Sequence, residues 1–208
     1  MSIPGFIGFS WPKSNNIIPK HSNTITKKPL QNKVSSSNHA VRDILPSQEE
    51  LKKARMESLV KAQDESRKDR SLAPHSGKTF CNIGVAHTLK DLGIDITDSK
   101  VGLAHPETGT PYTANLMARK LATSAKEKDG YWMEVDSKKA QKLANMGLPV
   151  IGAQRSKGHG HIVTVRPCGY DNIKAEGDVL LNNIGKKNAV MTENKCFRNP
   201  PLYYTPRG

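Results

Sequence analysis

Three residues of this 208-residue chain could together perform nucleophilic chemistry: Cys81, His161 and Asn183. Cys81 follows a polar loop over residues 75–78 and opens a segment whose apolar residues recur at helical spacing. A thiol at a helix N-terminus feels the positive end of the helix dipole, which lowers its pKa and favours the thiolate. This is the setting of a cysteine nucleophile, provided that the chain also supplies a base.

The base is expected at the start of a β-branched segment, where Gly158-His159-Gly160 leads into His161-Ile162-Val163. An imidazole at a strand end can take a proton from a thiol and then return it to a leaving amine. A third group usually orients such an imidazole through its other nitrogen. Asn183 is the first candidate for this role and Asn182 the second, because both end the next strand candidate.

Each of these residues also has an ordinary structural interpretation. A cysteine that opens an apolar helix is typical of a buried small side chain, and a histidine at a strand start is often a surface residue. His159 and His161 could bind zinc as a His-x-His pair, but a structural zinc site needs about four ligands. Cys168 and Cys196, the only nearby thiols, lack the spacing of a ligand pair, so neither a metal nor another cofactor is expected.

The three cysteines leave two redox interpretations open. Cys81, Cys168 and Cys196 could all be free thiols in a reducing compartment. Alternatively, a Cys168–Cys196 bridge in an oxidising compartment would leave Cys81 free to react. The sequence alone fixes no connectivity.

The helices and strands that position the three side chains are predicted from the spacing of apolar residues and from residues that cap helices. A capping box at Ser47 and Glu50 predicts a helix over about 47–69. The other predicted elements are helices over Cys81–Leu92, Ala114–Ser124 and Lys138–Met146, and strands over Tyr131–Val135, Leu148–Ala153, His161–Arg166, Asp178–Asn183 and Leu202–Thr205. Helices followed by a run of strands predict an α+β fold with an antiparallel sheet.

Composition divides the chain near residue 75. Residues 1–46 are rich in Ser, Asn, Pro and Lys without a sustained period, which is typical of a disordered or extended segment. The charged helix over about 47–69 completes a basic extension, residues 1–75. The breaker Ala73-Pro74-His75-Ser76-Gly77 then precedes the expected domain, residues 76–208.

The net charge of +13 is spread over the chain, with +6 in residues 1–75 and +7 in the rest. No block of like charge resembles a nucleic-acid arm, and a diffuse positive field suits any polyanion, whether nucleic acid, anionic lipid or bacterial wall. The sequence contains no run of about 18 apolar residues, so no membrane-spanning helix is expected. The first residues lack the pattern of a secretory signal, so action outside the cytoplasm would need another export route.

The order of a helix-borne cysteine, a strand-borne histidine and a polar residue on the next strand resembles the papain-like cell-wall hydrolases. The likeness is closest to the cysteine, histidine-dependent amidohydrolase/peptidase (CHAP) group and its NlpC-type relatives. It is carried by Thr79-Phe80-Cys81-Asn82, Ala114-Asn115-Leu116-Met117, Trp132 with Val135, Ala140 with Ala144–Ile151, Gly160-His161-Ile162-Val163 and Asn183-Ile184-Gly185. No Asp precedes the cysteine, as one does in many NlpC-type members.

The resemblance implies a papain-like core with N-terminal helices on an antiparallel sheet, in which Cys81 is the nucleophile, His161 the base and Asn183 the orienting residue. It implies peptidoglycan as the substrate, an amide bond as the target, and action in the periplasm or wall of a target bacterium. Delivery by a type VI secretion machine or a phage lysis system would bring a carrier and an immunity protein as partners, with no nucleic acid.

Two other functions stay open at this point. The same thiol–imidazole domain could be a host-directed effector that acts on proteins as a protease, deamidase or acyltransferase. Alternatively, the chain could be a non-catalytic basic binding module.

Overall fold

The computed structural model describes residues 46–173, 175 and 177–207. Residues 1–46 are the segment expected to be disordered. Residues 1–45 of it lie outside the described residues. The helices are α1 (Gln48–Lys68), a short 3-10 turn (Arg70–Leu72), α2 (Cys81–Asp91), α3 (Ala114–Lys126), α4 (Ser137–Ala144) and α5 (Glu193–Cys196). The strands are β1 (Trp132–Val135), β2 (Ile151–Gln154), β3 (His161–Val165), β4 (Leu180–Asn183), β5 (Ala189–Thr192) and β6 (Leu202–Pro206).

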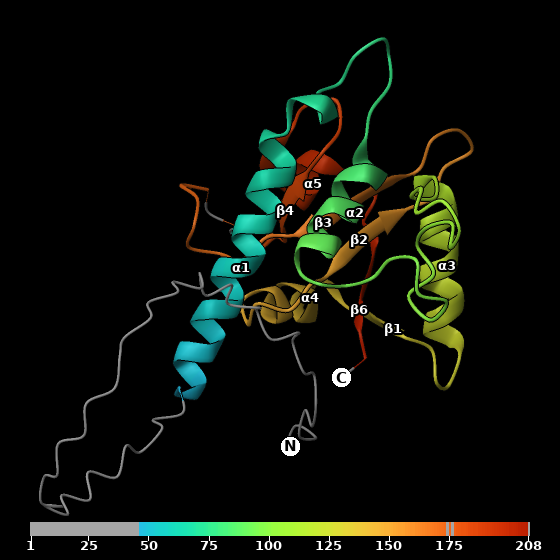
Figure 1. Cartoon of the computed structure of the whole chain (residues 1–208). Coiled ribbons are helices and arrows are strands. Elements are labelled where there is room, and N and C mark those ends of the chain that lie inside the picture. The colour runs from blue at the N-terminus through green and yellow to red at the C-terminus, as the bar shows by residue number, and fades with distance from the viewer. Residues whose placement is uncertain (1–45, 174, 176, 208) are drawn as a thin grey trace, which may run out of the picture.

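The six strands form one sheet in the order β1-β6-β2-β3-β4-β5, and every neighbouring pair is antiparallel. The predicted α+β class with an antiparallel sheet is thereby confirmed. The strand expected near the end of the chain, β6, is not at an edge but lies between β1 and β2 (Figure 1). Three elements were not predicted: the 3-10 turn Arg70–Leu72, the edge strand β5 and the single-turn helix α5.

Apolar clusters cover both faces of the sheet, as the two-residue period of a strand requires. On one face, Ile162 of β3 packs with buried residues of α2 and α3. On the other face, Val163 and Val165 pack with the buried side of α4 and with Phe197. Figure 1 shows α2 and α3 as separate helices over the sheet, with α1 beside α2. His161, two residues before Val163, belongs to the α4 face by this alternation.

The segment 94–113, expected to be a loop, contains no helix or strand but is packed into the core. Ile96 and Leu103 are fully buried in the same cluster as α2 and α3. The indole Nε1 of Trp132 donates a hydrogen bond to the carbonyl of Val101 at 3.0 Å. Trp132 is itself fully buried, so it is a core residue that joins this segment to β1.

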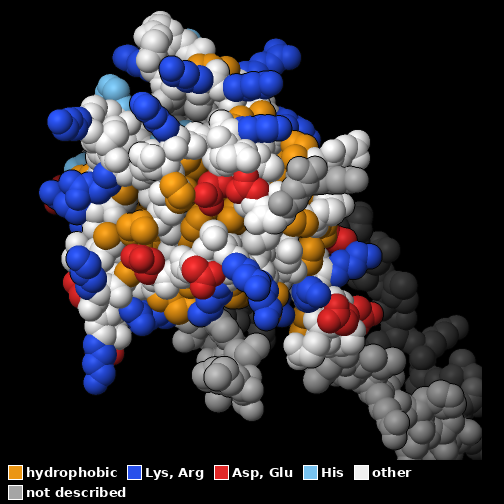
Figure 2. All heavy atoms as spheres, turned by 180° about the vertical axis from the view of Figure 1, so that it is seen from behind, with side chains coloured by type: hydrophobic (Ala, Val, Ile, Leu, Met, Phe, Trp, Pro, Cys, Tyr) orange, Lys and Arg blue, Asp and Glu red, His pale blue; other side chains and the backbone are white. Residues whose placement is uncertain are grey.

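Basic side chains are scattered over the surface rather than collected in one block, as the face in Figure 2 shows. This agrees with the even distribution of the net charge along the sequence. No helix within the described residues is both long enough and apolar enough to cross a membrane.

The helix expected in the extension, α1, packs on the elements that follow it. Its predicted capping box is present, since Ser47 and Glu50 each accept a hydrogen bond from the other's backbone N–H. In its second half, Ser66 donates to the carbonyl of Gly84 in α2 at 3.0 Å. Gln63 donates to Thr164 at 3.0 Å and to the carbonyl of Val165 at 2.8 Å, both in β3. The C-terminal half of α1 is therefore part of the same packed unit as the sheet.

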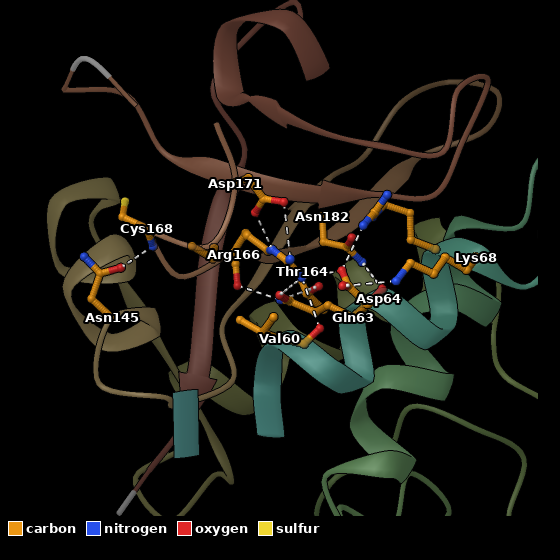
Figure 3. Close-up of polar contacts among 12 residues, drawn as sticks. Val60, Gln63, Asp64, Lys68, Asn145, Thr164, Arg166, Cys168, Asp171 and Asn182 are labelled. Carbon is orange, nitrogen blue, oxygen red and sulfur yellow. Dashed lines mark hydrogen bonds and ion pairs between the residues drawn. The ribbon is translucent and has the colours of Figure 1, made fainter. Parts of the chain in front are cut away.

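A buried arginine fastens α1 to the end of β3 (Figure 3). Arg166 is 1% exposed and pairs with Asp64 of α1 at 2.9 Å and with Asp171 at 2.8 Å. Its guanidinium also donates to the carbonyl of Val60 at 3.1 Å. Burial would raise the pKa of Asp64, but a hydrogen bond from Arg67 and the charge of Arg166 outweigh it and lower that pKa.

Candidate active site

Cys81 is the first residue of α2, as predicted, and its side chain is 5% exposed. The thiol lies beside the backbone N–H of Ile162, the second residue of β3. The helix can approach the sheet closely here because it carries Gly84, where an added Cβ would come within 2.5 Å of Ile184. The sequence therefore places the thiol against the residue that follows His161.

The expectation that the helix N-terminus lowers the pKa of Cys81 is wrong for this structure. Burial raises the pKa of the thiol, and this effect outweighs the backbone N–H groups of Ile162, Asn82 and Cys81, which lower it. The helix dipole acts as expected in direction, but desolvation of the thiolate is the larger effect. Cys81 is therefore a neutral thiol at rest.

His161 and Asn183 form a direct hydrogen bond. The imidazole Nε2 lies 2.7 Å from Asn183 Oδ1. The Asn183 amide is itself held in orientation, because its Nδ2 donates to the carbonyl of Lys187 at 2.6 Å. An amide oxygen can only accept, so Nε2 carries the imidazole proton and Nδ1 keeps its lone pair. Burial lowers the pKa of His161, and the bond to Asn183 opposes this only in part.

The sheet register explains why Asn183 rather than Asn182 lies against the histidine. Thr164 pairs with Asn182, so these two side chains share one face, toward α1. Asn182 donates there to the carbonyl of Gln63 at 3.2 Å. Side chains alternate between the two faces along a strand. His161 is three residues before Thr164 and Asn183 is one residue after Asn182, so both lie on the opposite face. The alternative between the two asparagines is resolved in favour of Asn183 as the neighbour of His161.

Two further residues of the site are Cys196, the last residue of the unpredicted helix α5, and Phe197, its C-cap. Cys196 donates a hydrogen bond from its sulfur to Asn183 Oδ1 at 3.4 Å, the same oxygen that accepts from His161. Burial, followed by the negative charges of a Cys81 thiolate and of Glu193, raises the pKa of Cys196 to about 12. Phe197 packs on the His161 ring with a centroid distance of 5.3 Å.

The approach to His161 is fixed by Asn115, the second residue of α3. Asn115 donates to the carbonyl of Ser156 and accepts from its N–H, each at 3.1 Å. Gly160, directly before His161, lies against the same Asn115 side chain and has no room for a Cβ. The absence of a side chain at Gly160 therefore leaves room for Asn115, a residue of the same chain.

All three cysteines are free thiols, so the alternative of a Cys168–Cys196 bridge is wrong for this structure. Cys196 lies in the cluster with Asn183, while the backbone N–H of Cys168 donates to Asn145 near α4. His159 is exposed in the loop before β3 and does not share a strand face with His161. Within the described part of the chain, no three His, Cys, Asp or Glu side chains gather into a metal site.

The arrangement contains the parts of a thiol–imidazole pair in its resting form. A neutral thiol lies beside β3, and a neutral imidazole with a free Nδ1 is oriented by an amide. In the described residues, no hydrogen bond joins the Cys81 thiol to the His161 ring. Such contacts are often loose in the absence of substrate and close only in the reacting complex.

No family model matches this sequence, and no curated protein matches it. The fold and the site define an α+β protein with a Cys–His–Asn cluster at one end of its sheet. Its resemblance to the papain-like cell-wall hydrolases therefore rests on the residues themselves.

The buried thiols predict a loss of stability in alkali. A thiol whose pKa is raised on folding keeps a proton that the unfolded chain releases, so its contribution is complete below the unfolded pKa and falls above it. For Cys196 this range runs from the ordinary value of 9.0 to about 12. We expect the thermal midpoint to decrease between pH 9 and pH 11, and to decrease less steeply in Cys196→Ala. Cys168→Ala controls for the loss of a thiol as such, and equal slopes in all three proteins would contradict the prediction.

Proposed function

We propose that this protein is a cysteine-dependent amidohydrolase or peptidase that cleaves an amide bond of peptidoglycan. The observation that supports it most directly is the 2.7 Å bond between His161 Nε2 and Asn183 Oδ1, which leaves Nδ1 free as a base. Cys81, beside the next residue of the same strand, supplies the nucleophile. A papain-like arrangement of the core is part of the same proposal.

In the first half of the proposed reaction, substrate binding brings the Cys81 thiol to Nδ1 of His161. The imidazole removes the thiol proton as sulfur attacks the amide carbonyl, and the negative charge on that oxygen faces the backbone N–H of Cys81. The imidazolium, still bonded through Nε2 to Asn183, gives its Nδ1 proton to the leaving amine. The carbon–nitrogen bond breaks, and a thioester on Cys81 remains.

In the second half, water replaces the amine. His161 Nδ1 takes a proton from the water as its oxygen attacks the thioester carbonyl, and the imidazolium returns that proton to the departing sulfur. The products are a carboxylic acid and the free thiol. Because the Cys81 thiol and the His161 imidazole are both neutral before the reaction, the thiolate forms only as the sulfur attacks the substrate.

The positive charge of the chain suits this substrate. Bacterial walls carry anionic polymers, and a diffuse cationic surface raises the local concentration of the protein near them, most strongly at low salt. Delivery into a target bacterium by a non-secretory route such as a type VI machine, with a carrier and an immunity protein, is part of the proposal and rests on the resemblance.

Incubation of the full chain with purified peptidoglycan sacculi tests the proposal. We expect soluble muropeptides to be released, and their masses to identify the cleaved bond as the sugar–peptide amide or a bond within the peptides. Cys81→Ala is the control. Intact sacculi with an unmodified Cys81 would contradict a wall hydrolase and would favour a protein substrate or a binding module.

A glycine beside the catalytic pair offers a finer test. A Cβ added at Gly185 would lie 3.3 Å from both His161 Cε1 and Asn183 Nδ2, so these groups would have to shift by a few tenths of an ångström. Since catalysis is sensitive to small displacements, we expect Gly185→Ala to lower the rate of hydrolysis about tenfold. Gly158→Ala is the matched control, because its added Cβ meets nothing within 4 Å. Equal rates for the two variants would show that the spacing of the pair does not limit the reaction.

A further inference from the structure

A hollow of about 260 Å³ lies directly before the candidate nucleophile. One wall is formed by residues 74–79, the loop that leads into Cys81, and the other by Lys186. Lys186 follows Gly185, which lies against the His161 ring. The hollow is therefore flanked by the two segments that carry the thiol and the orienting amide.

The first wall is a tight hairpin turn. The N–H of Lys78 donates to the carbonyl of His75 at 2.9 Å, and the two residues between them, Ser76 and Gly77, have φ values of 51° and 71°. Two positive φ values at the centre define a turn of type I′, which holds its flanking residues in a fixed relation. The His75 ring packs on Phe80 at a centroid distance of 4.8 Å. The turn is thus fixed to the residue immediately before Cys81.

One side chain ties the second wall to Leu72, the last residue of the 3-10 turn, two residues before the first wall begins. Asn188 Oδ1 accepts from the N–H of Gly185 at 3.1 Å, and its Nδ2 donates to the carbonyl of Leu72 at 3.1 Å. The loop after β4 is therefore linked to the segment that leads into the hairpin turn. Both walls are held by hydrogen bonds within this chain, so the hollow has a defined shape.

The lining of the hollow is cationic. It includes Lys78 and Lys186 and contains no acidic side chain. Neither lysine takes part in an ion pair of the described residues. Two cations without a counter-charge in one hollow favour an anionic ligand.

We propose that this hollow binds the free carboxylate of an acidic peptide and so selects substrates with that group beside the scissile amide. Its place in the reaction rests on the proposed function. The hollow is smaller than the 300–1,000 Å³ of a typical ligand site, so it holds one charged group rather than a whole ligand. An ammonium–carboxylate contact joins two opposite charges, whereas a carboxamide in the same position accepts a hydrogen bond but carries no charge that attracts the lysines.

Binding to the full chain carrying Cys81→Ala, which cannot turn over, tests the inference. The probes are N-acetyl-L-alanyl-D-glutamate, the same peptide with both carboxylates converted to carboxamides, and inorganic phosphate. We expect the dicarboxylate to bind about tenfold more tightly than the diamide at low salt. Adding Lys78→Gln and Lys186→Gln should abolish this difference. Adding Lys138→Gln and Lys142→Gln, two exposed lysines on α4, should preserve it and matches the change in net charge.

Four outcomes would overturn the inference: no binding of the dicarboxylate, equal binding of the diamide, no effect of the Lys78 and Lys186 changes, or phosphate binding as tight as the peptide. Thermal unfolding shows whether each variant is folded. The binding test does not depend on turnover. Intact sacculi would therefore contradict the proposed function without contradicting carboxylate binding in the hollow.

Discussion

Replacing Cys81 with alanine is expected to abolish the release of muropeptides from sacculi, a loss of at least about a thousandfold. The variant lacks the thiol that lies beside Ile162 of β3, while His161 and Asn183 keep their 2.7 Å bond. Replacing His161 with alanine should cost about as much, and the double variant little more, because the two residues act as one unit. The measurement is the initial rate of muropeptide release.

Asn183→Ala should be less damaging, about a hundredfold, because Asn183 touches the base and not the reacting atoms. Thermal unfolding of each variant separates lost chemistry from lost structure. Activity retained in Cys81→Ala would remove the thiol from the mechanism and with it the proposed function.

Replacing Arg166 with methionine is expected to lower the free energy of unfolding by about 3–5 kcal/mol, the range for a buried ion pair that loses one partner. Arg166 is 1% exposed and is the shared cation of Asp64 and Asp171. Its loss leaves Asp171 without an ion-pair partner among the described residues, whereas Asp64 keeps Arg67 at 2.9 Å and Lys68 at 3.5 Å. The bond to the carbonyl of Val60 is lost as well. Urea unfolding followed by circular dichroism measures the change.

Lys61→Met is the control for removing a cation from α1. Its contact with Glu65 is exposed and 3.8 Å long, so we expect a change within about 0.5 kcal/mol. Adding Asp171→Leu to Arg166→Met should recover part of the lost stability, because the carboxylate that has lost its partner is then removed too. A loss below about 1 kcal/mol for Arg166→Met would show that the apolar contacts of α1 and its hydrogen bonds through Gln63 and Ser66 hold the helix without Arg166.

Much of the fold was accessible from the sequence because its signals are local. Cap residues and helical spacing predicted α1 and α2 within a few residues, and β-branched residues predicted β3. The positions of Cys81 and His161 follow from those bounds. The choice between Asn182 and Asn183 required the register of β3 against β4, which pairs Thr164 with Asn182 and which no local pattern specifies.

The parts that escaped prediction depend on contacts between distant segments. Strand β5 has three half-buried residues and one buried residue at a sheet edge, too few for a clear alternation, and α5 is one turn. The pKa of Cys81 was predicted in the wrong direction because the helix end is visible in the sequence and the burial is not. The packing of α1 also escaped prediction, because its buried residues Gln63 and Ser66 are polar and do not stand out in the sequence of a charged helix.

The central position of β6 has a consequence for how the protein is made. Leu202–Pro206 pairs with both β1 and β2, so the six-stranded sheet cannot be complete until residue 206 has left the ribosome. During synthesis, β1 and β2 have no common neighbour, and the strands that carry His161 and Asn183 can pair only with each other and with β2 and β5. Native pairing of β1 across about 70 residues of chain is a slow, non-local step. The nascent chain therefore completes its fold only after translation has passed its last strand.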